Sequence, residues 1–230
     1  MPREAMPVTV RSGARQAGWL TLELVLLYWL APIAMAVAVY GLHVPLFVLM
    51  LPVLLIFVVL LLRDPGFHVL DMLRRGIPHS ELASILLLLP FGAAAILAVG
   101  YWLEPARVFE FPRQRPILWL IIMVAYPLVS VTAQEILFRV YFFHRFETLF
   151  AGRPRLAQLL NGAAFAFAHI LFWNWVSPVV SFFGGVLFAW RYQRSKSYWA
   201  AVLEHSLYGD LIFTAGLGRY FFTGISNVSL

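Results

Sequence analysis

Ionisable and amide side chains interrupt three stretches of the chain that are otherwise apolar. They are Gln134, Glu135, Arg139, His169, His205 and Asp210. A charged side chain at the centre of a membrane helix costs roughly 2.5 to 3.5 kcal/mol on insertion scales, so such a residue needs a partner or a function. A carboxylate and two imidazoles in one wet pocket could activate water and stabilise charge that develops on a carbonyl. These side chains form our candidate site.

Helical spacing decides which of these side chains can share a face. Glu135 and Arg139 are four residues apart, so the simplest interpretation is a pair that offsets its own insertion cost. Gln134 lies about 100° around the helix from Glu135. One of these two can therefore face a site while the other holds Arg139. A single membrane histidine is usually a packing residue, but His169 and His205 fall at depths that let them meet.

Membrane-spanning helices must position these groups. Of the 230 residues, 62% are hydrophobic and 12% are charged, against roughly 25% charged in a soluble domain. Because a bilayer core takes about 20 apolar residues per helix, we expect an all-α, polytopic bundle with about seven spans. The expected spans are 21–40, 45–62, 82–103, 117–143, 156–172, 176–190 and 198–217. A cytoplasmic segment, 1–20, would precede one transmembrane domain, 21–222.

The distribution of basic residues predicts the orientation. If the N-terminus is cytoplasmic, most Lys and Arg lie inside, including Arg3, Arg11 and Arg15. The outer segments then hold Arg107, Arg113, Arg115 and Arg219. The net charge of +6 is thus assigned to loops at the bilayer, and we expect no nucleic-acid partner. The chain has no cysteine, which excludes disulfides and thiolate catalysis, and together with the short loops this favours a prokaryotic inner membrane. The segment 64–80 could form a short interfacial helix or a solvated loop.

The three polar stretches resemble the motifs of the CAAX prenyl endopeptidase and bacteriocin-processing (CPBP, Abi) family of glutamic intramembrane proteases. Those motifs are Glu-Glu-x-x-x-Arg, Phe-x-x-x-His, and a His followed a few residues later by Asn. They correspond here to Gln134-Glu135 with Arg139, Phe165 with His169, and His205 with Asp210. The resemblance covers about 117–213, roughly the C-terminal half of the chain.

This resemblance implies a CAAX-protease-like helical fold with a catalytic cavity that opens within the membrane. It implies a glutamate and two histidines that activate water for direct attack on a peptide bond, an Asn that stabilises the oxyanion, and neither a metal nor another cofactor. The chain departs from the motifs at Gln134, whose amide cannot accept a proton at any useful pH, and at Gly209, four residues after the histidine. We therefore expect Glu135 to act as the base, Arg139 to hold it, and the two histidines to position water and oxyanion.

The substrate would be a membrane-associated peptide or protein, and nothing in the sequence selects its lipidation or the oligomeric state of the enzyme. Three alternatives stay open. Two imidazoles and a carboxylate also match a catalytic zinc set, although no His-Glu-x-x-His helix is present. Loss of the first glutamate would suit a non-catalytic membrane binding protein. Intramembrane His and Asp could also form the proton relay of a transporter.

Overall fold

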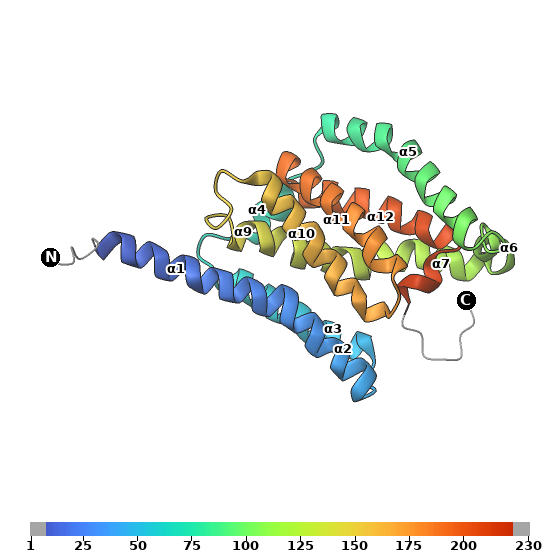
Figure 1. Cartoon of the computed structure of the whole chain (residues 1–230). Helices are drawn as coiled ribbons and strands as arrows, with labels where there is room; N and C mark the ends of the chain where they lie inside the picture. The colour runs from blue at the N-terminus through green and yellow to red at the C-terminus, as the bar shows by residue number, and fades with distance from the viewer. Residues whose placement is uncertain (1–7, 223–230) are drawn as a thin grey trace.

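A computed structural model describes residues 8–222, and this part of the chain consists of helices and their connections (Figure 1). Arg3 and the rest of 1–7 lie outside the described residues. A first long helix runs through α1 (Val8–Val25), the π-helical turn Leu26–Leu30 and α2 (Ala31–Gly41). It is followed by α3 (Leu46–Arg63), α4 (Val69–Arg74), α5 (His79–Leu103) and α6 (Glu110–Gln114).

The second half of the chain begins with one long helix that changes type along its length. It runs through α7 (Pro116–Ala125), the π-helical turn Tyr126–Val131, α8 (Thr132–Glu135), the π-helical turn Ile136–Tyr141 and α9 (Phe142–Arg145). The remaining helices are α10 (Pro154–Ala168) with the 3₁₀ turn His169–Phe172, α11 (Val176–Ser195), α12 (Tyr198–Thr214) and the 3₁₀ turn Gly218–Phe221.

Each predicted span coincides with one of these helices. Four helical stretches are long and apolar enough to cross a membrane: Arg15–Gly41, His79–Leu103, Pro116–Arg145 and Pro154–Phe172. A shorter apolar helix covers Val48–Arg63. The helix α11 carries Arg191 and Arg194 in its last turns and α12 carries Glu204 and Asp210, which lowers their hydropathy. The prediction of a polytopic, all-helical membrane protein is confirmed.

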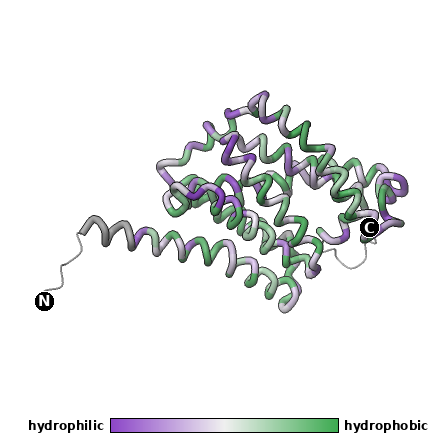
Figure 2. The backbone as a smooth tube through the Cα atoms, turned by 45° about the horizontal axis from the view of Figure 1, so that its top comes forward, coloured by the Kyte–Doolittle hydropathy of each residue, from purple (hydrophilic) through white to green (hydrophobic). Residues whose placement is uncertain are grey.

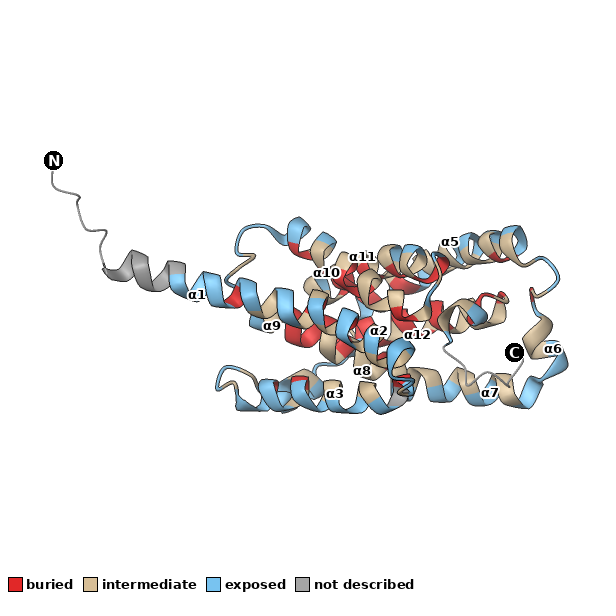
Figure 3. Ribbon diagram, turned by 60° about the horizontal axis from the view of Figure 1, so that its bottom comes forward, coloured by how far each residue is buried: buried red, intermediate tan, exposed pale blue. Residues whose placement is uncertain are grey.

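Three central helices carry a large share of the buried residues. Figure 1 shows α10, α11 and α12 between α1 to α3 on one side and α5 on the other, and the buried residues in Figure 3 concentrate on them. Apolar residues follow most helices along their lengths in Figure 2. Glycines bring α10 and α11 close together, since a Cβ on Gly162 would lie 2.5 Å from Val186 Cγ2. Small residues serve this purpose in membrane bundles.

The segment 64–80 contains a short helix, which answers the question left open by its sequence. This helix, α4, packs against the turn between α11 and α12. The indole Nε1 of Trp199 donates to Leu73 O at 2.9 Å, and Arg75 Nη1 donates to Lys196 O at 3.2 Å. These contacts hold the start of α12 in place.

An ion-pair network inside the bundle joins α5, α11 and α12. The guanidinium of Arg191 is fully buried and donates to both carboxylate oxygens of Glu204, at 2.8 and 2.9 Å. It also donates to Glu81, whose second oxygen accepts from Arg194 Nε at 2.8 Å. Each of these buried charges has a partner, as their desolvation requires.

We expect Arg191→Met to destabilise the protein strongly, because it leaves Glu81 and Glu204 buried without their main partner. Removal of one member of a buried pair costs about 3 to 5 kcal/mol, which corresponds to a fall in Tm of roughly 10 °C. Thermal unfolding in detergent measures this effect, with Arg155→Met at an exposed site as the control. A Tm equal to that of the wild-type protein would show that the network contributes little.

Candidate active site

A cavity of about 760 Å³ lies between α5, α7, α10, α11 and α12. Its wall is mostly apolar, with side chains such as Ile96, Ile122 and Leu187. The polar residues that line it are Tyr126, Ser130, Gln134, His169, Ser181, His205 and Tyr208. The cavity therefore brings together side chains that the sequence places on separate helices.

The imidazole of His205 is held from behind by Glu135. Its Nδ1 lies 2.8 Å from Glu135 Oε1, and both side chains are buried. Because an ionised carboxylate only accepts hydrogen bonds, Nδ1 carries the proton and donates it. In the neutral imidazole Nε2 then keeps a lone pair. This Nε2 lies 3.3 Å from the hydroxyl of Tyr126, on the cavity wall.

Glu135 is fully buried and is not among the residues that line the cavity. Its other oxygen, Oε2, lies 3.4 Å from Arg139 Nε, so the four-residue spacing does produce an ion pair. The Arg139 guanidinium lies over the ring of Phe165 at 4.6 Å and over that of Phe188 at 5.4 Å. It also donates to Gly185 O at 3.3 Å. Arg139 thus fixes the carboxylate that faces His205.

His169 lies on the same cavity as His205. It follows α10 directly, and its Nδ1 lies 2.7 Å from Phe165 O. The carbonyl must accept this bond, so Nδ1 carries the proton and Nε2 keeps a lone pair. The ring of Phe165 packs against both imidazoles, with centroid distances of 4.6 Å to His169 and 5.5 Å to His205. The structure therefore brings the two histidines to one site.

Gln134 faces the cavity, whereas Asp210 does not line it. The amide of Gln134 donates from Nε2 to Ser130 Oγ at 2.7 Å, and its Oε1 is buried with no hydrogen-bond partner among the described residues. Asp210 Oδ1 is also buried without such a partner. Of the six candidate residues, the structure thus gathers five at the cavity or directly behind its wall, and Asp210 lies outside this lining.

Sequence reasoning missed Tyr126, which packs against Gly209. A Cβ on Gly209 would lie 2.3 Å from Tyr126 Cε1 and 2.6 Å from its hydroxyl. The absence of a side chain at 209 therefore makes room for the tyrosine. Tyr126 begins a π-helical turn inside an apolar run, where nothing in the sequence marks it as a site residue. The one signal was Gly209, because a glycine at that position of the third motif leaves space for a side chain from another helix.

Three side chains brace the long helix that carries Glu135 and Arg139. Tyr28 donates to Leu137 O at 2.6 Å, Asn161 donates to Phe138 O, and Tyr198 donates to Thr132 O at 3.2 Å. Two of these carbonyls belong to the π-helical turn Ile136–Tyr141. The braces come from three other helices, so the bundle as a whole fixes how this helix is turned.

The described residues contain no group of three or more His, Asp or Glu side chains that could hold a metal ion. Glu135 is paired with His205 and Arg139, so of the histidine and acidic side chains at the site only the two imidazoles keep a free nitrogen, whereas a catalytic zinc takes three protein ligands. The donor set therefore does not fit the zinc alternative, and the chemistry below uses protein groups and water.

Residues 116–209 match a family model described as type II CAAX prenyl endopeptidase Rce1-like. The match includes Gln134, Glu135, Arg139, His169 and His205 and ends one residue before Asp210. Comparisons with curated proteins and with solved structures give no match. Apolar helices, a cavity between them and the matched segment agree with the resemblance seen in the three motifs. This segment of the chain is therefore similar to the type II CAAX prenyl endopeptidases, in agreement with the CAAX protease (CPBP) resemblance of the three motifs.

Proposed function

We propose that the protein is an intramembrane endopeptidase that hydrolyses a peptide bond of a membrane-associated peptide or protein with an activated water molecule. The observation that carries this proposal is the contact of 2.8 Å between Glu135 and His205, whose free nitrogen lies at the cavity. A carboxylate that orients an imidazole and stabilises its protonated form is an arrangement that general-base catalysis uses repeatedly.

His205 Nε2 is the group that would remove a proton from water. The sequence favoured Glu135 for this step, but its carboxylate lies behind His205. In the proposed reaction the water oxygen attacks the peptide carbonyl carbon while its proton passes to Nε2. The imidazolium is stabilised by Glu135, which Arg139 holds in place. When the C–N bond breaks, Nε2 returns the proton to the leaving amine, so no proton is gained or lost.

His169 and Gln134 would position the reactants. The free Nε2 of His169 can accept a hydrogen bond from the attacking water and so hold it beside His205. The Oε1 of Gln134 has no partner among the described residues, and it can accept a backbone N–H of the substrate. Gln134 thereby contributes to binding, although its amide cannot act as a base.

Tyr126 supplies the hydrogen-bond donor for the oxyanion in this proposal. Its hydroxyl lies at the cavity, 3.3 Å from His205 Nε2, the atom that takes the proton. In the resting site the hydroxyl donates to Nε2. When the attacking water takes the place of the hydroxyl at Nε2, the hydroxyl turns to the substrate carbonyl oxygen and donates to it as that oxygen becomes negative in the tetrahedral intermediate. A donor placed where charge develops is a major source of catalysis.

The amide at position 134 favours a second candidate function, a membrane binding protein that keeps the cavity without cleaving its ligand. The variant Gln134→Glu separates the two. If the wild-type protein cleaves, it is an enzyme as it stands. If only Gln134→Glu cleaves, the natural chain is a binding protein whose catalytic carboxylate has been replaced.

We expect Glu135→Gln and His205→Ala each to lower cleavage by at least about 100-fold, the contribution of a positioned acid or base. The measurement uses protein in liposomes and quenched fluorescent peptides with a CAAX-type end, farnesylated and unmodified. Glu147→Gln is the matched control, since Glu147 is exposed and is not among the residues that line the cavity. Full activity of Glu135→Gln would remove Glu135 from the mechanism.

We expect Tyr126→Phe to lower kcat by about 100-fold with KM changed by less than about twofold, because the lost donor acts in the transition state. The phenylalanine keeps the ring that packs on Gly209, so the Tm in detergent should stay close to that of the wild type. Tyr101→Phe, which removes the hydroxyl of an exposed residue outside the cavity lining, should leave both constants unchanged. Equal kcat for Tyr126→Phe and wild type would rule out this donor.

A further inference from the structure

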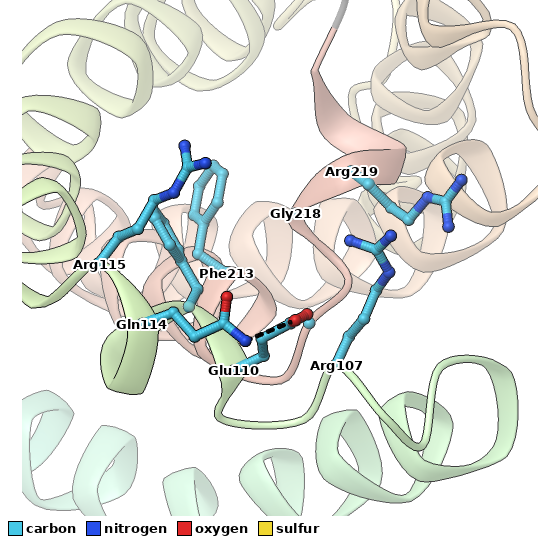
Figure 4. Close-up of a pocket in the computed structure, with 9 residues that line it drawn as sticks. Arg107, Glu110, Gln114, Arg115, Phe213, Gly218 and Arg219 are labelled. Carbon is cyan, nitrogen blue, oxygen red and sulfur yellow. Dashed lines mark hydrogen bonds between the residues drawn. The ribbon is translucent and has the colours of Figure 1, made fainter. Parts of the chain in front are cut away.

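A second pocket, of about 240 Å³, lies where the connection between α5 and α7 meets the end of α12. Figure 4 shows the guanidinium groups of Arg107, Arg115 and Arg219 around it, with Phe213 between them. Phe213 also lines the large cavity. The pocket is thus a basic site beside the candidate active site and separate from its polar residues.

Among the described residues, fewer carboxylates than guanidinium groups line or adjoin this pocket. Glu104 lies 3.4 Å from Arg107 Nε and 3.2 Å from Arg219 Nη1, and it also accepts from Tyr220. Glu110 accepts from Gln114 Nε2 at 3.0 Å. One carboxylate, that of Glu104, therefore pairs with two of the three guanidinium groups, and that of Glu110 is bonded to an amide. The Arg115 side chain forms no hydrogen bond or ion pair with another of the described side chains.

The basic residues of this end of the bundle gather at one place. The sequence assigned four arginines to the outer side: Arg107, Arg113, Arg115 and Arg219. Three of them line the pocket, although Arg219 lies more than a hundred residues along the chain from the others. The fourth, Arg113, donates to the backbone carbonyls of Val108 and Phe109 and so stabilises the connection between α5 and α7. Scattered loop charges would not converge in this way.

The pocket lies at the level where the surface of the membrane is expected. One candidate span ends at Leu103 and the next begins at Pro116, so the pocket forms between the ends of two spans. Large apolar side chains flank it and face outward. Trp102 is 73% exposed and Ile117 is 74% exposed. Tryptophan at a span end is typical of the level of the lipid headgroups.

We propose that this pocket binds the headgroup phosphate of an anionic phospholipid, whose acyl chains lie along the outward faces of α5 and α7. The planar fork of arginine matches phosphate oxygens in two-point hydrogen bonds. Basic clusters at a span end attract anionic lipids. The exposed apolar residues beside the pocket favour a lipid over a peptide carboxylate, which would leave those faces uncovered. This inference does not depend on catalysis.

Binding of lipid to the purified full-length protein in detergent tests the proposal, measured by native mass spectrometry. Phosphatidylglycerol should bind more tightly than phosphatidylcholine with the same acyl chains. Arg115→Gln should weaken phosphatidylglycerol about fivefold, the factor that corresponds to about 1 kcal/mol per basic residue at an anionic surface. Arg155→Gln makes the same charge change at an exposed site on α10 and should have no effect.

Several results would overturn the proposal. These are equal binding of the two lipids, equal weakening by Arg115→Gln and Arg155→Gln, and displacement of phosphatidylglycerol by a peptide with a free C-terminus and not by its amidated form. Inorganic phosphate is the control that separates a lipid headgroup from free phosphate. At millimolar concentration it should not displace phosphatidylglycerol, and displacement would indicate a site for free phosphate. Arg219→Gln gives a second measure if Arg115→Gln does not fold.

Discussion

The buried carboxylate of Glu135 is the group around which the central helices are arranged. An ionised carboxylate inside an apolar bundle is stable only if charges and hydrogen bonds replace its lost water. His205 from α12 and Arg139 from the same helix do so. The guanidinium of Arg139 is in turn covered by the rings of Phe165 and Phe188. One polar group thereby fixes the relative positions of α8, α10, α11 and α12.

The helices could be predicted from the sequence because, in lipid, the backbone of an apolar stretch of span length must form its hydrogen bonds within the stretch itself. It also predicted that the three motifs would meet, since each contributes a polar group that lipid would not tolerate alone. The orientation of the chain, its domain limits and the roles of the site residues stay predictions. The helices α11 and α12 were placed correctly although their charged residues lower their hydropathy.

Other features depend on contacts that spacing alone does not contain. Gln134 and Glu135 could each have faced the cavity, and the choice between them rests on how neighbouring helices turn their own helix. The sequence paired Asp210 with His205, yet one step along α12 separates Asp210 from Gly209, which does line the cavity. Tyr126 looked like any aromatic residue of an apolar run. The link from Arg191 to Glu81 joins residues over a hundred positions apart, beyond the reach of any local pattern.

The two π-helical turns that flank Thr132–Glu135 affect which side chain of this helix faces the cavity. A π turn accommodates a residue that a regular α-helix would not, and each residue advances the helix by about 100°. Gain or loss of such a turn would therefore rotate the following side chains by about one position without moving the helix axis. Positions 134 and 135 could then exchange places at the cavity while the surrounding bundle is preserved.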